Sequence, residues 1–309
     1  MKPVVEVKHL CKHYDQHAAV NDLSFTVQEE DIYGFLGQNG AGKSTTIRMM
    51  LTLIAPTSGS INIFGLDLKQ HRNEILSRTG AIIERPDLYK YLTAYDNLSI
   101  FARLSGMKIN RSMLMDQLEM VGLANRAKDK VKTFSQGMKQ RLGIAISLIH
   151  NPRLLILDEP TNGLDPQGIA DMRNLILRLK HDFKKTIIIS SHLLSEVELI
   201  ANRMIIIDQG KKIVEGEVAT LLDPNKTLVE ITVSKHQDAI DKLLASQWAK
   251  YFISNTSLQL TMSKALIPDF IKECVERDIS LFSVKTSHSL ENYFLSLTTP
   301  NQHVESFAN

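Results

Sequence analysis

A glycine-rich stretch near the N-terminus constrains this chain more than any other feature. Residues 34–46 read GFLGQNGAGKSTT and follow the apolar pair Ile32 and Tyr33. Glycines at this spacing let backbone N–H groups approach phosphate oxygens, and a helix that begins at the lysine adds partial positive charge. An apolar strand before the loop and a helix after it are the context that this pattern requires. The stretch predicts a phosphate-binding loop, and it leaves open a small-molecule kinase, a GTPase switch, a DNA motor or a transporter.

The individual residues of this loop have expected roles. We expect the Lys43 ammonium to reach the β- and γ-phosphates of a nucleotide, and the Ser44 hydroxyl to coordinate Mg²⁺. The alternative is a chance glycine-rich turn, which the flanking strand and helix disfavour. The residues expected to contact the nucleotide here are Gly37, Gln38, Asn39, Gly40, Ala41, Gly42, Lys43, Ser44 and Thr45.

A second segment, LLILDEP at residues 154–160, supplies acidic groups. Its four apolar residues predict a buried strand, and Asp158 lies at the carboxyl end, where a Mg²⁺-facing carboxylate is needed. Glu159 follows directly and is placed to orient or polarise an attacking water. A kinase of this kind has little use for the second acid, because its nucleophile is a substrate hydroxyl. The pair therefore favours hydrolysis over transfer, and the alternative is a surface acidic pair at a strand end.

The composition of the 309 residues excludes several classes of protein. Hydrophobic residues make up 43% and charged residues 23%, which is ordinary for a globular chain. Lys plus Arg is 36 against 34 for Asp plus Glu, and this balance argues against a nucleic-acid binder. Cys11 and Cys274 lack metal-ligand spacing, so we expect reduced thiols in a cytosolic protein. We find no signal peptide pattern and no apolar run of the ~18 residues that span a membrane, so another chain must supply any membrane part.

Strand and helix patterns alternate along most of the chain. Continuous apolar runs such as LLILD and TIIIS are typical of parallel strands that are covered on both faces. Shorter strand patterns at 3–10 and 23–28 flank a turn-like stretch, and the spacing over residues 88–126 is helical. These patterns predict an α/β fold with a parallel-sheet core.

The pattern of predicted strands and helices changes near residues 221–227, and we expect a second domain beyond this point. The pattern there reads β-α-β-β-α-β, which fits a small ferredoxin-like α+β domain, and a last helix is expected over residues 289–297. We predict domains at residues 1–222 and 223–309, with a helical subdomain over about 86–150 in the first.

The segment FSQGMKQRLGIAISLI at residues 134–149 decides between the open classes. It resembles the signature motif of the ATPase subunits of ABC transporters, in which a Ser and a Gly begin a helix ahead of a Gln-Arg pair. The matching residues are Ser135, Gly137, Gln140 and Arg141. The order of the motifs matches across almost all of residues 1–220. The resemblance implies a P-loop NTPase fold of ABC ATPase type, with a parallel-sheet core, an antiparallel β subdomain and a helical subdomain, and it implies ATP as the nucleotide.

The same resemblance implies roles for residues outside the phosphate loop. Tyr14 would stack on adenine, with an ordinary packed aromatic as the alternative. Asp165 in GLDP would lie at the dimer contact, and a loop at 82–86 would link the nucleotide to a transmembrane partner. His192 in IIISSHLLSEVE would hold the γ-phosphate, with a structural histidine at a strand end as the alternative. With Lys43 and Glu159, His192 completes the expected catalytic set.

A signature helix within one chain would lie far from the phosphate loop of that chain. Two chains arranged head-to-tail would instead place Ser135, Gln136 and Gly137 against the γ-phosphate held by the other subunit. ATP binding would close such a dimer and hydrolysis would open it. The expected partners are a second ATPase subunit, as a homodimer or a paired homologue, and a polytopic membrane permease at the cytoplasmic face of a bacterial membrane; no nucleic acid is expected.

Two positions depart from the usual pattern. The signature normally carries a second Gly and a terminal Gln, where this chain has Gln136 and Met138, so dimer closure would be slowed or retuned. Glu84 replaces the usual Gln in the loop after a strand; either residue offers an oxygen to Mg²⁺, but Glu adds a charge and cannot donate a hydrogen bond. The expected Mg²⁺ ligands are Ser44, Glu84 and Asp158, unless the role of the Gln has shifted or is unneeded.

A finer resemblance concerns the substrate. The stretch GAIIERPDLYKYLTAYDNL at residues 80–98 and the signature segment resemble the bacitracin and lantibiotic immunity exporters of Gram-positive bacteria. This implies a peptide antibiotic as the cargo that is expelled. The alternatives are an exporter ATPase for another cargo, an importer, a regulator that binds ATP without hydrolysing it, and a soluble ABC-type ATPase acting on ribosomes or DNA. The single P-loop, the single signature and the lack of heptads disfavour the last of these.

Overall fold

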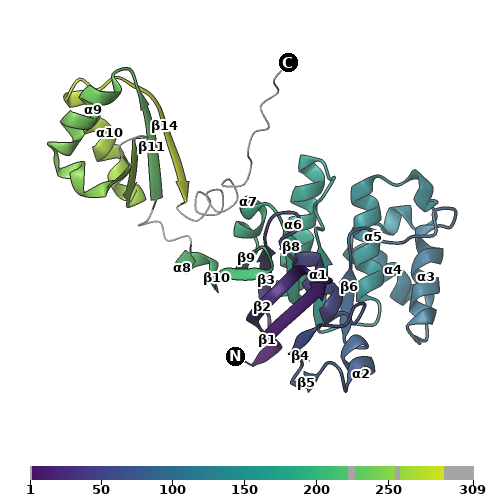
Figure 1. The fold of residues 1–309 in the computed structure, drawn as a ribbon. Helices are drawn as coiled ribbons and strands as arrows, with labels where there is room; N and C mark the ends of the chain where they lie inside the picture. Colours follow the sequence, from purple (N-terminus) through teal and green to yellow (C-terminus); the bar gives the residue numbers. More distant parts are fainter. Residues whose placement is uncertain (1, 222–226, 255–257, 289–309) are drawn as a thin grey trace, which may run out of the picture. The chain divides into compact units, whose positions relative to one another are not determined.

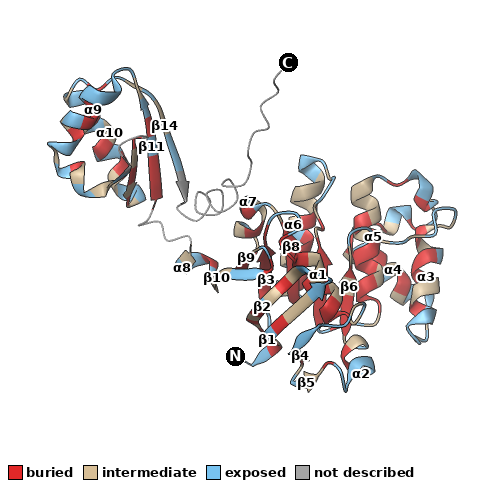
Figure 2. Ribbon diagram, viewed as in Figure 1, coloured by how far each residue is buried: buried red, intermediate tan, exposed pale blue. Residues whose placement is uncertain are grey.

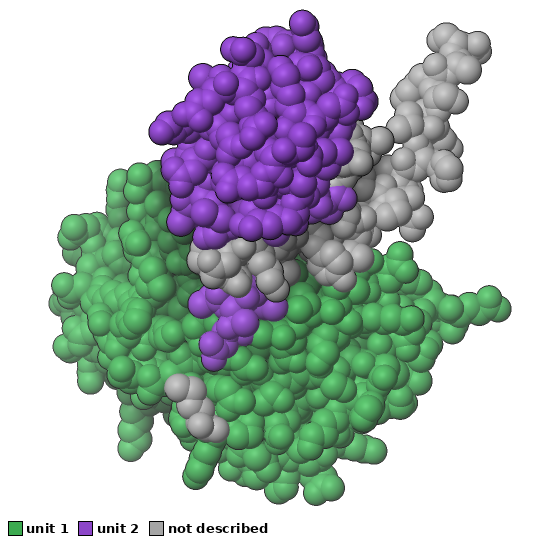
Figure 3. Space-filling model, turned by 90° about the vertical axis from the view of Figure 1, so that its left-hand side faces the viewer, with its two compact units in different colours: residues 1–216 green, residues 217–309 purple. Residues whose placement is uncertain are grey.

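The computed structural model describes residues 2–221, 227–254 and 258–288, and the chain forms two compact units, residues 1–216 and 217–309 (Figure 3). The domain boundary predicted between residues 222 and 223 and the last helix expected over 289–297 lie outside the described residues.

The centre of the first unit is a sheet of six strands in the order β10-β9-β3-β8-β7-β6 (Figure 1). The strands β3 (Ile32–Leu36), β7 (Leu154–Asp158) and β8 (Thr186–Ser191) are buried along their whole length (Figure 2). They pair in parallel with one another and with β6 (Thr79–Ile82) and β9 (Arg203–Asp208), and β10 (Lys211–Glu217) lies at one edge. Because the strands are parallel, the carboxyl-terminal ends of β3, β7 and β8 all point to the same end of the sheet. The predicted α/β fold is confirmed.

A second, antiparallel sheet has the order β2-β1-β4-β5. It consists of β1 (Pro3–Tyr14), β2 (His17–Gln28), β4 (Ser58–Ile63) and β5 (Leu66–Asp67). The first two strands are longer than the patterns at 3–10 and 23–28 indicated. The pairing of β1 with β2 contains register shifts, and His9 and Asp22 have positive φ angles of 49° and 54°. Each irregularity interrupts the alternation of apolar and polar residues, so the sequence pattern ends before the strand does.

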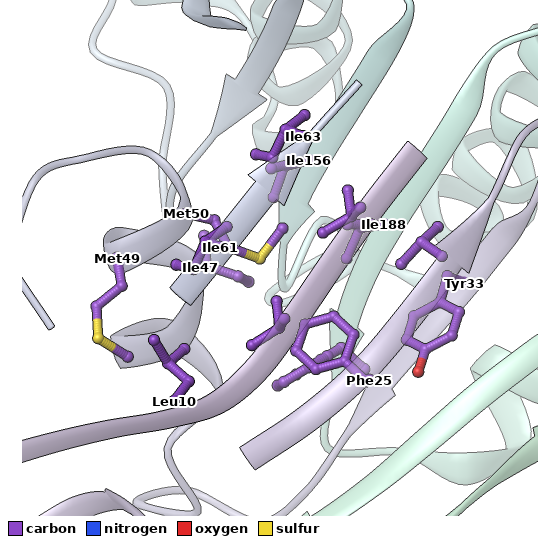
Figure 4. Packing of buried hydrophobic residues seen from close by; sticks show 14 of the residues in the cluster. Leu10, Phe25, Tyr33, Ile47, Met49, Met50, Ile61, Ile63, Ile156 and Ile188 are labelled. Carbon is purple, nitrogen blue, oxygen red and sulfur yellow. The ribbon is translucent and has the colours of Figure 1, made fainter. Parts of the chain in front are cut away.

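One hydrophobic core joins this sheet, the parallel sheet and helix α1 (Lys43–Met50) (Figure 4). This core includes Ile47 of α1, Phe25 of the antiparallel sheet, and Ile156 and Ile188 of the parallel sheet, all of them at most 3% exposed. Phe25 also stacks on Tyr33 of β3, with the ring centroids 5.8 Å apart. Packing on two sheets fixes the position of α1, and therefore of the loop that precedes it.

The helices of the first unit include three that pack against one another, namely α3 (Ala94–Leu104), α4 (Arg111–Met120) and α5 (Gln136–Leu148) (Figure 1). Helix α3 begins with a capping box, in which Thr93 and Asp96 each bond the backbone N–H of the other. The remaining helices of this unit are α2 (Arg72–Leu76), α6 (Pro166–His181) and α7 (Leu194–Glu198), with 3₁₀ turns at Ala124–Arg126 and Val131–Thr133.

The second unit begins with α8 (Val218–Leu221) and contains a four-stranded antiparallel sheet in the order β12-β13-β11-β14. Its elements are β11 (Thr227–Val233), α9 (His236–Leu244), a 3₁₀ turn (Gln247–Tyr251), β12 (Phe252–Ser254), β13 (Gln259–Met262), a 3₁₀ turn (Lys264–Leu266), α10 (Ile267–Glu276) and β14 (Leu281–His288). This is the β-α-β-β-α-β order of the ferredoxin-like fold.

The second unit has a separate hydrophobic core of its own. Trp248 and Phe270 meet edge to face with their ring centroids 5.2 Å apart, and the Trp248 indole N–H donates to Glu273 at 2.8 Å. Cys274 is a buried free thiol, and burial raises its pKa to about 11. Within the described residues of both units, no helix has the length and apolar character needed to cross a membrane.

Candidate nucleotide-binding site

The glycine-rich loop connects β3 to α1, and its glycines are required for different reasons. Gly40 and Gly42 have φ angles of 85° and 102°, a region that favours glycine. A Cβ at Gly42 would lie 2.5 Å from a carbonyl oxygen of β2, and one at Gly37 would lie 2.7 Å from a carbonyl oxygen of β9. A Cβ at Gly40 would meet no described atom within 4 Å, so the loop is packed at both ends and open at its middle.

Lys43, the first residue of α1, is 5% exposed and is held by the loop itself. Its ammonium donates to the backbone carbonyls of Gly37 at 2.7 Å and Gln38 at 3.2 Å. The same nitrogen lies 3.3 Å from Oε1 of Glu159, which follows β7. The parallel arrangement of β3 and β7 therefore brings the lysine of one motif to the carboxylate of the other.

Glu159 is held from both its backbone and its side chain. Its φ angle is 51°, a left-handed conformation that is uncommon for a residue with a side chain and is frequent at functional sites. Its N–H donates to the Ser190 hydroxyl at 2.9 Å, and its Oε2 lies 2.8 Å from Nδ1 of His192. Ser190 in turn donates to Oδ1 of Asp158 at 2.5 Å. The ends of β7 and β8 thus share one hydrogen-bond network, formed by Asp158, Glu159, Ser190 and His192 with Lys43 beside Glu159, which we call the network around Glu159. The sequence did not point to Ser190 as a member.

Two carboxylate oxygens of this network are buried without a hydrogen bond in the described part of the chain, Oδ2 of Asp158 and Oε1 of Glu159. Asp158 is 1% exposed. Oε1 of Glu159 has the Lys43 ammonium 3.3 Å away, whereas no ion pair compensates the burial of Oδ2 of Asp158 in the described residues. A buried acceptor of this kind is costly, and a divalent cation with its bound water would relieve that cost. The half-buried Ser44 in the first turn of α1 offers a further hard oxygen. The donor set therefore fits Mg²⁺.

The predicted signature residues lie in a different environment. Ser135 is the N-cap of α5 and accepts from the N–H of Met138 at 3.2 Å. A Cβ at Gly137 would contact only Leu164 among the described atoms that could obstruct it, at 3.9 Å, so packing within the chain does not require a glycine there. Asp165 is likewise the N-cap of α6 and accepts from the N–H of Gly168 at 3.0 Å. In the described residues no hydrogen bond joins Ser135, Gln136 or Gly137 to the glycine-rich loop.

Two further predicted residues also lie outside the network around Glu159. Tyr14 at the end of β1 is 46% exposed, and the Lys12 ammonium lies 4.9 Å from its ring centroid. Glu84 has a φ angle of 58° and pairs with Arg48 of α1 at 2.5 Å. The structure therefore brings together Lys43, Asp158, Glu159 and His192, and it leaves Tyr14, Glu84, Ser135 and Asp165 with other neighbours.

Comparison with known proteins identifies the class to which this arrangement belongs. A family model described as ABC transporter matches residues 20–162. Over 301 residues, covering 96% of this chain and 97% of its relative, the chain is 40% identical to the uncharacterized ABC transporter ATP-binding protein YhcH of Bacillus subtilis (strain 168). Unit 1 is thus a P-loop ATPase domain of ABC type. The chain belongs to the ATP-binding proteins of ABC transporters, as its signature segment predicted.

Two other relatives carry more particular names. The chain is 47% identical over 240 residues to the bacitracin transport ATP-binding protein BcrA of Bacillus licheniformis, covering 78% of each chain. It is 45% identical over 214 residues to the lantibiotic transport ATP-binding protein SrtF of Streptococcus pyogenes, covering 69% of this chain and 91% of SrtF. Among solved structures, an ATP-binding subunit of an ABC transporter has a TM-score of 0.62 at 29% identity, covering 71% of this chain and 91% of that chain.

These comparisons confirm the predicted family, the ABC ATPase fold and the binding of ATP. The roles of the individual site residues stay predictions, as do Mg²⁺, the dimer and the permease.

Proposed function

We propose that this chain is the ATP-hydrolysing subunit of an exporter that expels peptide antibiotics of the bacitracin or lantibiotic type. The contact of Glu159 with both Lys43 and His192 carries the hydrolytic part of this proposal. The names of the BcrA and SrtF relatives support the cargo. An exporter ATPase for another cargo is the second candidate, because one of the relatives matched over nearly its full length has no named cargo.

The proposed chemistry assigns one task to each residue of the network around Glu159. Glu159 orients and polarises the attacking water, and His192 fixes the Glu159 carboxylate and complements charge that develops on the γ-phosphate. Lys43 moves its contacts from the loop carbonyls to the β- and γ-phosphates. Ser44 and Asp158 would hold Mg²⁺, which supplies charge neutralisation at the phosphates when bound. Glu84 is the third proposed ligand, and its Oε1 pairs with Arg48 in the described structure.

A second copy of the chain completes the site in this proposal. Ser135, Gln136 and Gly137 of the second copy approach the γ-phosphate, with Asp165 at the contact between the copies. The space around Gly137 supports this arrangement, because the folded chain has room for a side chain at a position that carries none. Tyr14 is proposed to stack on adenine, and its exposed ring is accessible for that.

A separate polytopic permease is the proposed membrane partner, and it would hold the chain at the cytoplasmic face of the membrane. A groove of about 230 Å³ supports a docking site for one cytoplasmic segment of the permease. Residues 81–83 and 85–88 line this groove together with Phe101 of α3 and Gly143 of α5. Tyr91, which follows residues 85–88, is 79% exposed and adds apolar surface.

The dimer is tested with Glu159→Gln, which keeps the shape of the side chain and removes its charge. This variant should bind ATP, fail to hydrolyse it and accumulate as a dimer in ATP and Mg²⁺, as measured by size-exclusion chromatography with light scattering. The matched control is the double variant Lys43→Ala/Glu159→Gln, which should remain monomeric. A Glu159→Gln protein that stays monomeric in ATP and Mg²⁺ contradicts the head-to-tail arrangement for the isolated chain.

The partner and the cargo are tested in the native host. We expect the tagged chain, purified from gently solubilised membranes, to bring with it a polytopic membrane protein in stoichiometric amount. Recovery with ribosomes or DNA instead would overturn the transporter assignment. Deletion of the gene for this chain should raise sensitivity to bacitracin or to lantibiotics, and the wild-type chain should restore resistance where Lys43→Ala does not. Unchanged sensitivity across such a panel favours another cargo.

A further inference from the structure

A third carboxylate, beyond those of Asp158 and Glu159, connects two of the segments that carry the network around Glu159. Glu196 lies in the first turn of α7, four residues after His192. Its Oε2 accepts a hydrogen bond from the Thr161 hydroxyl at 2.7 Å and another from the Ser191 hydroxyl at 3.1 Å. Hydrogen bonds to an ionised acceptor are stronger than those between neutral groups, so this carboxylate firmly links the loop after β7 to the end of β8.

Each of the two hydroxyls lies within two positions of a residue of the proposed hydrolytic set. Thr161 follows Glu159 by two positions and leads into the GLDP segment that ends at Pro166. Ser191 directly precedes His192, and it is 1% exposed. One acceptor therefore connects the loop after the proposed water-orienting glutamate to the strand end that presents the histidine.

Glu196 also determines how the backbone around His192 is held. Because a carboxylate can only accept, Ser191 must donate its hydroxyl hydrogen to Glu196. The lone pairs of that hydroxyl then accept the N–H of Leu193, at 3.0 Å. The Ser191 carbonyl accepts the N–H of Gly37 at 3.3 Å, at the start of the glycine-rich loop. His192 is thus bracketed by bonds on both sides, and one of them depends on Glu196.

We propose that Glu196 is a positioning residue for ATP hydrolysis. It keeps the segments that carry Glu159 and His192 at a fixed spacing, and it transmits displacement of the GLDP segment to the histidine through Thr161. Glu196 acts through these groups and makes no contact with ATP. The inference rests on the roles given to Glu159 and His192 in the proposed function. A purely structural role, stabilising α7 by charge near its N-terminus, would affect folding and leave the turnover of the folded protein unchanged.

The test compares kcat, KM, ATP affinity and melting temperature of the purified full-length chain. Glu196→Ala and Thr161→Val should each lower kcat about 10- to 100-fold, since small misplacements of reacting groups cost that much. ATP affinity should stay within about twofold, because neither residue belongs to the glycine-rich loop. Glu196→Gln, whose amide oxygen still accepts both hydroxyls, should keep kcat within about threefold. The control is Glu119→Ala on the exposed side of α4, which should match the wild type.

A double variant separates this inference from the proposed function. If Glu196 acts through His192, then Glu196→Ala should cause no further loss of kcat in a His192→Ala background. A full further loss in that background overturns the positioning role while the role of His192 stands. A His192→Ala protein with wild-type kcat overturns the role of His192 and this inference with it. If Glu196→Ala does not fold, Thr161→Val in the same His192→Ala background gives the same comparison, and a wild-type kcat for folded Thr161→Val contradicts the link.

Discussion

The network around Glu159 and the turns that begin α5 and α6 differ in how the chain satisfies their polar groups. Glu159 contacts Lys43 and His192, which come from two other segments of the chain. Ser135 and Asp165 are also hydrogen-bonded, but each accepts from a backbone N–H three residues further along its own chain segment. The network is therefore assembled by tertiary folding, whereas each turn is complete through local capping alone.

This difference matters because a locally complete turn can be presented to another molecule without an energetic penalty in the free chain. In the described residues, Oδ2 of Asp158 in the network around Glu159 is buried without a hydrogen bond, and a ligand would offset the cost of its burial. The turns at α5 and α6 need no ligand to be stable. Substitutions in the network should therefore affect hydrolysis and packing together, while substitutions in the turns can affect hydrolysis alone.

The largest effect is expected for Lys43→Ala. The ammonium is bound to two loop carbonyls and lies beside Glu159, so its loss removes a phosphate contact and the counter-charge of a buried carboxylate. We expect ATP turnover to fall about 10²- to 10³-fold or more, as for the loss of one charge-stabilising donor in a catalytic site. A phosphate-release assay measures this, with the exposed Lys272→Ala in α10 of the second unit as the control. Turnover within tenfold of the wild type would contradict the assigned role.

Two glycines of the same helix, Gly137 and Gly143, test the comparison more sharply. A Cβ at Gly143 would lie 2.6 Å from Cβ of Pro86, so Gly143→Ala should cost about 1–3 kcal/mol of unfolding free energy. A Cβ at Gly137 has room, so Gly137→Ala should leave stability unchanged or raise it by up to about 1 kcal/mol. ATP turnover of Gly137→Ala should nevertheless fall at least about tenfold, because the added methyl group would obstruct close approach of the helix to phosphate.

Urea unfolding monitored by circular dichroism measures the stability of both glycine variants, and the same preparations serve for turnover. If Gly137→Ala is destabilised as much as Gly143→Ala, then the start of α5 is packed within the chain and the distinction between the two regions fails.

A smaller effect is expected at Ser135, where capping and phosphate contact can be separated. Ser135→Ala removes the N-cap bond to Met138 and should cost about 1 kcal/mol of stability. Ser135→Asn should recover that stability, because Asn is an equally good N-cap. It should not recover the turnover, because its longer side chain would occupy the space of the γ-phosphate in the closed dimer. Recovery of both by Asn would mean that Ser135 acts as a cap alone.

The network around Glu159 could be predicted from the sequence because it obeys a simple rule. The motifs that carry Lys43, Asp158 and His192 each adjoin a continuous apolar run, and the carboxyl ends of parallel strands lie together. Ser190 and Glu196 could not be found in this way, because a serine in a buried strand and an acid in a short helix are unremarkable in sequence. Their roles depend on which neighbours the tertiary packing supplies.

The environment of Glu84 is a second case in which the sequence does not reveal a tertiary neighbour. Its substitution for the usual Gln is visible in the sequence, and the family resemblance implies a Mg²⁺ ligand at this position. The sequence gives no indication that Arg48, 36 positions earlier, lies beside it. That proximity arises because α1 packs between two sheets and turns Arg48 toward the loop, which no local pattern encodes.

The smallest effect is expected for this pair. Both side chains are largely exposed, at 43% for Arg48 and 64% for Glu84, so the ion pair should contribute no more than about 1 kcal/mol. Glu84→Gln should leave ATP affinity within about threefold of the wild type and change turnover by less than about tenfold. Arg48→Gln frees Glu84 from its partner and should shift turnover by a similar factor. If the pair restrains Glu84, the double variant will differ from the product of the single effects, and this non-additivity should shrink as salt screens the charges. Strict additivity would mean that the two residues act independently. Complete loss of ATP binding in Glu84→Gln would mean that Glu84 belongs to the network around Glu159, and the distinction between the two regions would fail at this position.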